Sequence, residues 1–130
     1  MKSALNPSAA LRAAAAAGDM PALLAALPQA FTQSTDDQGR TALIIAARHN
    51  RVEAVRALAP ISPLDAEDLL GHTALLSAAA HDCVEACEAL LEFYDPLKPN
   101  KRGYTALMVA TCNPKTLAFL LPLKIGRAHV

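Results

Sequence analysis

Cysteine and histidine are the side chains of this sequence that could bind a metal, attack a substrate or carry a proton. They are His49, His72, His81, His129, Cys83, Cys87 and Cys112. Cys83 and Cys87 form a C-x-x-x-C pair, which alone is a weak indication of a zinc site because structural zinc takes four ligands. The sequence has no G-x-x-x-x-G-K, nucleophile-elbow or H-E-x-x-H pattern. We therefore expect no enzyme, no metal and no cofactor.

One stretch of the sequence occurs three times, and it should form the structure that positions these side chains. The copies span residues 36–46, 68–78 and 100–110. Gly39, Gly71 and Gly103 hold the same place in each copy, so the period, 71 − 39 or 103 − 71, is 32 residues. A unit of this length cannot bury a core alone. The chain is therefore predicted to be a stacked array.

Each copy is typical of a tight turn followed by a helix. Asp or Asn is its first residue and Gly its fourth, a pattern that suits a turn because Asx side chains bond their own backbone and Gly takes positive φ at low cost. Thr41, Thr73 and Thr105 stand just before an apolar run. A threonine hydroxyl there accepts a hydrogen bond from a helical N–H, so all three are predicted N-caps.

A second helix is predicted in each unit. Residues 52–58 and 84–90 align almost letter for letter, and their apolar positions recur at a spacing of three. Val55 and Cys87 then hold equivalent core positions. Cys87 is therefore interpreted as a small buried hydrophobic residue and not as a reactive thiol.

The first and last units depart from this pattern. Residues 8–17 and 20–27 fit a degenerate first unit, in which Gly18 ends the first helix. In the last unit the turn between the two helices is one residue shorter, so Pro114 is predicted to begin the second helix. The last apolar residues should form an exposed edge, because no capping helix follows them. They are Phe119, Leu120, Leu121 and Leu123.

The turn, cap and apolar positions together resemble those of ankyrin repeats, which have a period of about 33 residues and a T-P-L-H-x-A core. The departures are Ala42, Ala74 and Ala106 in place of Pro, and Ile44, Leu76 and Met108 in place of His. They remove the side-chain network between Thr and His but keep the helix starts. The resemblance implies an all-α ankyrin-repeat solenoid of stacked helix-turn-helix units joined by β-turn loops, with about three and a half repeats.

We expect the ankyrin repeat domain to span residues 5–124. Its parts are a degenerate repeat at 5–35, repeats at 36–67 and 68–99, and an incomplete repeat at 100–124. Residues 125–130 read Ile-Gly-Arg-Ala-His-Val and match the peptide encoded by a common sequencing-adapter string. They are therefore interpreted as a tail that is not native.

Charge and composition narrow the functional classes. The formal net charge is +0, which argues against a general attraction to nucleic acid or acidic membranes. No apolar run approaches the roughly 18 residues of a membrane span, and three cysteines without disulfide spacing favour a cytoplasmic protein. Residues 65–95 hold eight acids and no Lys or Arg, whereas residues 96–130 hold six bases and no acid. We interpret this segregation as attraction between stacked repeats, with a charged recognition groove as the alternative.

The resemblance implies a non-catalytic scaffold that binds a protein partner and no small-molecule substrate. In ankyrin-like proteins the turn tips and the exposed ends of the first helices line a concave surface. The matching positions are Asp37, Gln38, Arg40, Arg48, His49, Leu69, Leu70, His72, His81, Lys101, Arg102, Tyr104 and Cys112. These positions vary among the copies, which fits either contact with a ligand or mere exposure to solvent. Leu69, Leu70 and Tyr104 favour recognition, because exposed apolar side chains flanked by arginines are typical of binding hot spots.

A second interpretation is that these repeats form the ankyrin segment of a larger enzyme, such as a protein kinase, whose catalytic domain lies outside this sequence. Thr105–Met108 reads T-A-L-M, which resembles ankyrin arrays attached to kinases of the NIMA-related class. A catalytic domain downstream in the full coding sequence would favour this interpretation.

Overall fold

The computed structural model describes residues 7–127, apart from the side chains of Gln29, Cys112 and residues 121–127. Its α-helices are α1 (Pro7–Ala17), α2 (Met20–Ala26), α3 (Ala42–Arg48), α4 (Val52–Leu58), α5 (Ala74–Ala80), α6 (Val84–Leu90), α7 (Ala106–Val109) and α8 (Pro114–Arg127). Short 3-10 helices, η1 (Leu27–Gln29), η2 (Ala59–Ile61) and η3 (Ala110–Cys112), follow α2, α4 and α7. Within residues 7–127 there is no strand, so the expected all-α architecture is confirmed.

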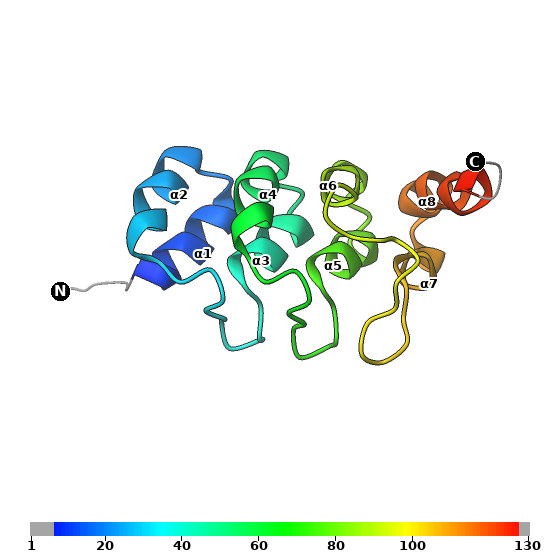
Figure 1. Cartoon of the computed structure of the whole chain (residues 1–130). Coiled ribbons are helices and arrows are strands. Elements are labelled where there is room, and N and C mark those ends of the chain that lie inside the picture. Colours follow the sequence, from blue (N-terminus) through cyan, green and yellow to red (C-terminus); the bar gives the residue numbers. More distant parts are fainter. Residues whose placement is uncertain (1–6, 128–130) are drawn as a thin grey trace.

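The helices form two layers. Helices α1, α3, α5 and α7 lie side by side in the first layer, and α2, α4, α6 and α8 cover them in the second (Figure 1). The loops between units extend beyond the first layer, away from the second, and their tips form a row (Figure 1). Leu11, Leu43 and Leu75 are buried in successive first helices. Since these leucines are 32 residues apart, the register predicted for the degenerate first unit is confirmed.

Small aliphatic side chains allow the first helices to pack closely. All six residues from Ala42 to Ala47 are buried, because α1, α5 and α4 surround α3 on three sides. Val55 and Cys87 are both fully buried at matching places in α4 and α6. The interpretation of Cys87 as a core residue is therefore confirmed, and burial raises the pKa of its thiol to about 12.

The turn geometry agrees with the sequence pattern. In the first turn, Oδ1 of Asp36 accepts hydrogen bonds of 2.9 Å from the backbone N–H groups of Gln38 and Arg40. The backbone N–H of Gly39 donates to the carbonyl of Asp36, and Gly39 has a φ of 76°. The turns at 68–72 and 100–104 repeat these hydrogen bonds, with Gly71 and Gly103 also at positive φ. The predicted left-handed glycines are confirmed.

Helix starts are also as predicted. The hydroxyls of Thr41, Thr73 and Thr105 each accept a hydrogen bond of 3.3 Å from the backbone N–H three residues later. Gly18, with a φ of 72°, ends α1, and Pro114 begins α8.

Helix α8 extends to Arg127, and the expected domain boundary at residue 124 stays a prediction. The end of the array differs from the expectation at Leu120. Leu120 is only 3% exposed, so its expected place on an open apolar edge is wrong. The physical reason is that α8 packs against α6 and α7, so Leu120 joins the buried hydrophobic cluster. The proposed non-native tail reaches residues 128–130, which lie outside the described residues, and it stays a prediction.

Candidate partner-binding face

The residues expected to contact a partner lie on the turns and on the exposed ends of the first helices. We call this surface the first-helix face, and it comprises the turns at 36–40, 68–72 and 100–104 with the exposed ends of α1, α3, α5 and α7. Hydrogen bonds join its turns in a row. The backbone N–H of Leu69 donates to the carbonyl of Gln38 at 3.0 Å, and the amide of Asn100 donates to the carbonyl of Gly71. Because each turn is fixed to the next, the side chains at the tips have a fixed spacing.

Four large apolar side chains are exposed on this face. Leu69 and Leu70 are 64% and 68% exposed, and Tyr104 is 48% exposed. Met108, on α7, is 52% exposed and was not among the expected residues. The sequence signal for Met108 was its place at the position where ankyrin repeats have His.

Two arginines lie on the turns with their guanidinium groups partly engaged. Arg40 pairs with Asp36 at 3.0 Å and is half-buried. Burial opposes ionisation of Asp36, but hydrogen bonds from Arg40 and Gln38 outweigh it and hold the pKa of this carboxyl below its ordinary value of 3.8. Arg102 is exposed, and its guanidinium donates to the carbonyls of Leu70 and Leu69 at 3.2 and 3.4 Å. The Arg102 charge therefore lies beside the two exposed leucines.

An arginine and a histidine from successive repeats meet at the helix ends. Nη2 of Arg48 lies 3.1 Å from Nε2 of His81, and Nδ1 of His81 lies 2.9 Å from the carbonyl oxygen of Ser77. Arginine only donates and a carbonyl only accepts, so this geometry requires the neutral His81 tautomer with its proton on Nδ1. His49 makes the equivalent contact with the carbonyl of Ile45 at 2.9 Å. Both histidines are exposed, as expected.

The remaining expected residues are distributed along the same face. Asp37, Gln38 and Lys101 are exposed, and His72 is half-buried. The side chain of Cys112 lies outside the described part of the chain. The structure thus brings together the tips of neighbouring turns, and it separates them from the helix-end residues Arg48 and His49 by the length of a first helix.

Direct ion pairs do not hold the oppositely charged segments together. The two ion pairs among the described side chains are Asp36–Arg40 and Arg56–Glu92, and neither joins residues 65–95 to residues 96–120. Hydrogen bonds join the two segments instead, among them one of 2.9 Å from the backbone N–H of Lys101 to Oε2 of Glu67.

A cavity of about 610 Å³ is lined by residues from the segments 64–76 and 93–101 and by Ala106, a feature that sequence reasoning missed. Its wall includes Leu76, Phe93 and Tyr94, and its rim carries both Glu67 and Lys101. The hydroxyl of Tyr94 donates to a backbone carbonyl and burial raises the pKa of Tyr94, so this side chain is part of the packing.

The cysteines, histidines and acids of the described residues are spread along the array. No group of three or more His, Cys, Asp or Glu side chains within the described part of the chain is arranged to hold a metal ion. Cys83 and Cys87 are both buried free thiols, and burial raises the pKa of both.

Comparison with known families agrees with this geometry. One family model, described as ankyrin repeats in three copies, matches residues 60–127, and a second, described as ankyrin repeats in many copies, matches residues 11–59. The chain belongs to the ankyrin repeat family. Ankyrin repeats are generally protein–protein interaction modules and are typically non-catalytic. No curated protein matches the chain. Among the described helices of this ankyrin repeat chain, none is long and apolar enough to cross a membrane.

Proposed function

We propose that this ankyrin repeat domain recognises a protein partner, without catalysis, through the first-helix face. The observation that carries the proposal is Leu70, which is 68% exposed at the tip of a turn. The turn itself is stabilised by Asp68, whose carboxylate accepts the backbone N–H groups of Leu70 and His72, and by Gly71. None of these interactions needs an apolar side chain at position 70.

The equivalent positions in the other turns support this reasoning. Gln38 and Arg102 hold the place of Leu70 in the first and third turns, and both are polar. The turn therefore folds with a polar residue there, and an exposed leucine has no folding benefit. An apolar side chain retained at such a site is typical of a binding anchor. Tyr104 and Met108 add apolar area on the next unit.

The test is capture of binding proteins from a matched lysate by the wild type and by the double variant Leu70→Asp/Tyr104→Ala. We expect the variant to lose the specific partners of the wild type. Leu24→Asp is the matched control, because Leu24 is 55% exposed on α2 in the opposite layer and should tolerate the charge. Thermal melts must show that all three proteins are folded. Retention of the same partners by the double variant would show that the first-helix face is not the binding site.

A further inference from the structure

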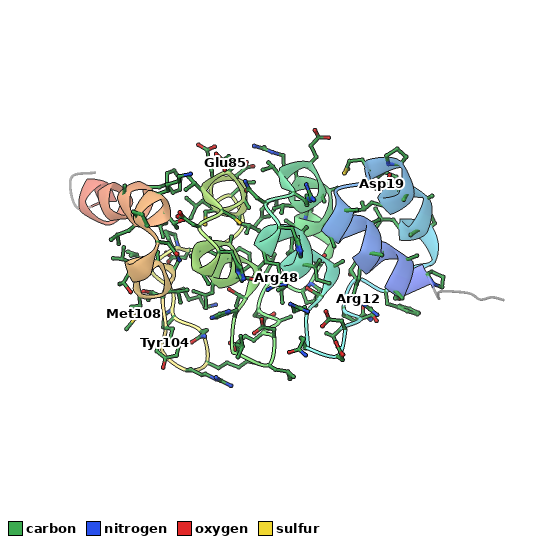
Figure 2. All side chains as sticks on the ribbon, turned by 180° about the vertical axis from the view of Figure 1, so that it is seen from behind. Arg12, Asp19, Arg48, Glu85, Tyr104 and Met108 are labelled. Atoms are coloured by element: carbon green, nitrogen blue, oxygen red, sulfur yellow. The ribbon has the colours of Figure 1, made fainter. Side chains whose placement is uncertain are left out.

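The first helices carry no acidic residue. Among the residues of α1, α3, α5 and α7, Arg12 and Arg48 are the charged ones, and none is Asp or Glu. The second layer carries both signs, with acids on α4 and α6 and bases on α4 and α8. Figure 2 shows Arg12 toward the turns, Arg48 near the middle of the molecule at the level of the first helices, and Asp19 and Glu85 on the side away from the turns. The helical part of the first-helix face is therefore positive.

The acids of the turns only partly offset this charge. The carboxylate of Asp36 is neutralised by Arg40, and that of Asp68 accepts two backbone N–H groups. Asp37 is an exposed acid of the first turn. The third turn, residues 100–104, contains Lys101 and Arg102 and no acid. Positive charge thus predominates at α1 and α3. The two bases of the third turn are partly offset by Glu67, whose carboxylate accepts the backbone N–H of Lys101.

The same face combines this charge with apolar area. Because the guanidinium of Arg102 donates to the carbonyls of Leu69 and Leu70, it is fixed at the edge of the leucine tip. These contacts use two of the five N–H donors of arginine, so others remain for a carboxylate. Figure 2 shows Tyr104 and Met108 close together at the last unit, on the side of the turns.

We propose that the first-helix face binds an acidic protein segment that also carries apolar side chains. This inference rests on the proposed function and specifies the chemistry of the partner. The apolar side chains of the segment pack on Leu70, Tyr104 and Met108, and its carboxylates pair with Arg48 and Arg102. Complementary charge of this kind raises the association rate and selects against basic partners.

The binding test uses three fluorescein-labelled 15-residue peptides and fluorescence polarisation at low and physiological salt. The probe repeats Leu-Glu-Glu, one control repeats Leu-Lys-Lys, and the other repeats Ser-Glu-Glu. We expect the Leu-Glu-Glu peptide to bind at least about tenfold more tightly than either control, and more weakly as salt screens the charges. Equal binding of the Leu-Lys-Lys peptide, or no measurable binding of the Leu-Glu-Glu peptide, would overturn the proposal.

Two charge-reversal variants locate the binding face. Arg48→Glu should weaken Leu-Glu-Glu binding by at least about fivefold, because it replaces attraction with repulsion. Arg56→Glu is the matched control, since it makes the same charge change at an exposed arginine of α4 in the other layer. Arg102→Glu serves as a second reversal if Arg48→Glu lowers the melting temperature. An equal loss in Arg56→Glu and the first-helix variants would overturn the placement on this face.

Other occupants are distinguished by two further measurements. If a 15-nucleotide single-stranded DNA binds more tightly than the Leu-Glu-Glu peptide, the occupant of the face is nucleic acid and the proposed acidic protein segment is wrong. Self-association in sedimentation velocity that is abolished by Leu70→Asp would identify a second copy of the chain as the occupant. If the peptide test fails but capture of proteins from lysate still depends on Leu70, the acidic partner is rejected and the proposed function is kept.

Discussion

The amide oxygen of Asn50 accepts a hydrogen bond of 3.0 Å from the backbone N–H of Ala86, one repeat further along the chain. Cys83, the N-cap residue just before α6, provides no side-chain hydrogen bond to the helix, so the preceding repeat caps it. The amide nitrogen of Asn50 also donates to Glu85, which lowers the pKa of that carboxyl. Asp82 repeats the arrangement by accepting two hydrogen bonds from Thr116 in α8.

Substitution of Asn50 should separate the cap from the backbone strain. Asn50 has a φ of 57°, so Asn50→Gly removes only the hydrogen bonds, at a cost of about 0.5–1.5 kcal/mol. Asn50→Ala adds left-handed strain of roughly 1–2 kcal/mol. In urea denaturation, the free energy of unfolding should therefore be highest for wild type, lower for Asn50→Gly and lowest for Asn50→Ala. Asp37→Ala, at an exposed residue, is the control and should leave it unchanged. Identical stabilities for the Gly and Ala variants would contradict the assigned strain.

The glycine of the second turn should be sensitive to a β-branched side chain. Gly71→Val places a side chain at a φ of 85°, and it should cost on the order of 1–3 kcal/mol through backbone strain. Its new Cβ would also lie 3.0 Å from Cδ of Arg102, whose flexible side chain can move aside. Gly103→Val isolates the strain, because no atom lies within 4 Å of the new Cβ there. An unchanged melting temperature in both variants would show that the turn assignment is wrong.

Sequence patterns predicted the features of this fold that are local. The Asx side chain, Gly39 and Thr41 act within a few residues of one another, so their roles follow from spacing alone. The cap from Asn50 to Ala86 joins residues 36 positions apart, and of the equivalent positions Asp82 also has an oxygen acceptor but Gly18 has none. The spacing marks these positions as helix ends, and it does not show that their side chains cap a helix of the next repeat.

On the candidate face, the sequence also predicted local features and not the contacts between units. The exposure of Leu69 and Leu70 follows from their place at a turn tip, and it was expected. The contacts of Arg102 with the carbonyls of those leucines depend on how one turn stacks on the next. The burial of Leu120 likewise depends on the packing of α8, which spacing does not specify.

The stability of the first turn should depend on pH through Asp36. Because its folded-state pKa is lowered below 3.8, its contribution is present above that pH and is lost as the pH falls through the folded-state value. Asp36→Asn keeps an oxygen acceptor, as Asn100 does in the third turn, but removes the charge. We expect wild type to exceed this variant by a few tenths of a kcal/mol at pH 7, with the difference vanishing in acid. The free energies of unfolding of both proteins are measured by urea denaturation. An increase of the difference between wild type and variant as the pH falls would contradict the lowered pKa of Asp36.

The thiol of Cys87 should be inert in the folded protein. A rise of its pKa from 9.0 to about 12 lowers the thiolate population about a thousandfold, and the side chain is fully buried. A short pulse of iodoacetamide at pH 8 followed by peptide mass mapping should leave Cys87 unmodified in the native protein and label it in urea. Equal labelling in both states would contradict its place in the core.

Site-specific photo-crosslinking tests most directly whether the first-helix face binds a protein. A benzophenone amino acid is introduced in place of Leu70 in one protein and in place of Leu24, the exposed leucine of the opposite layer, in another. Both proteins are irradiated in the same cell extract. The structure predicts discrete cross-linked products of higher mass from position 70 and none of these products from position 24. The same products from both positions, or products from position 24 alone, would contradict the assignment of partner binding to this face.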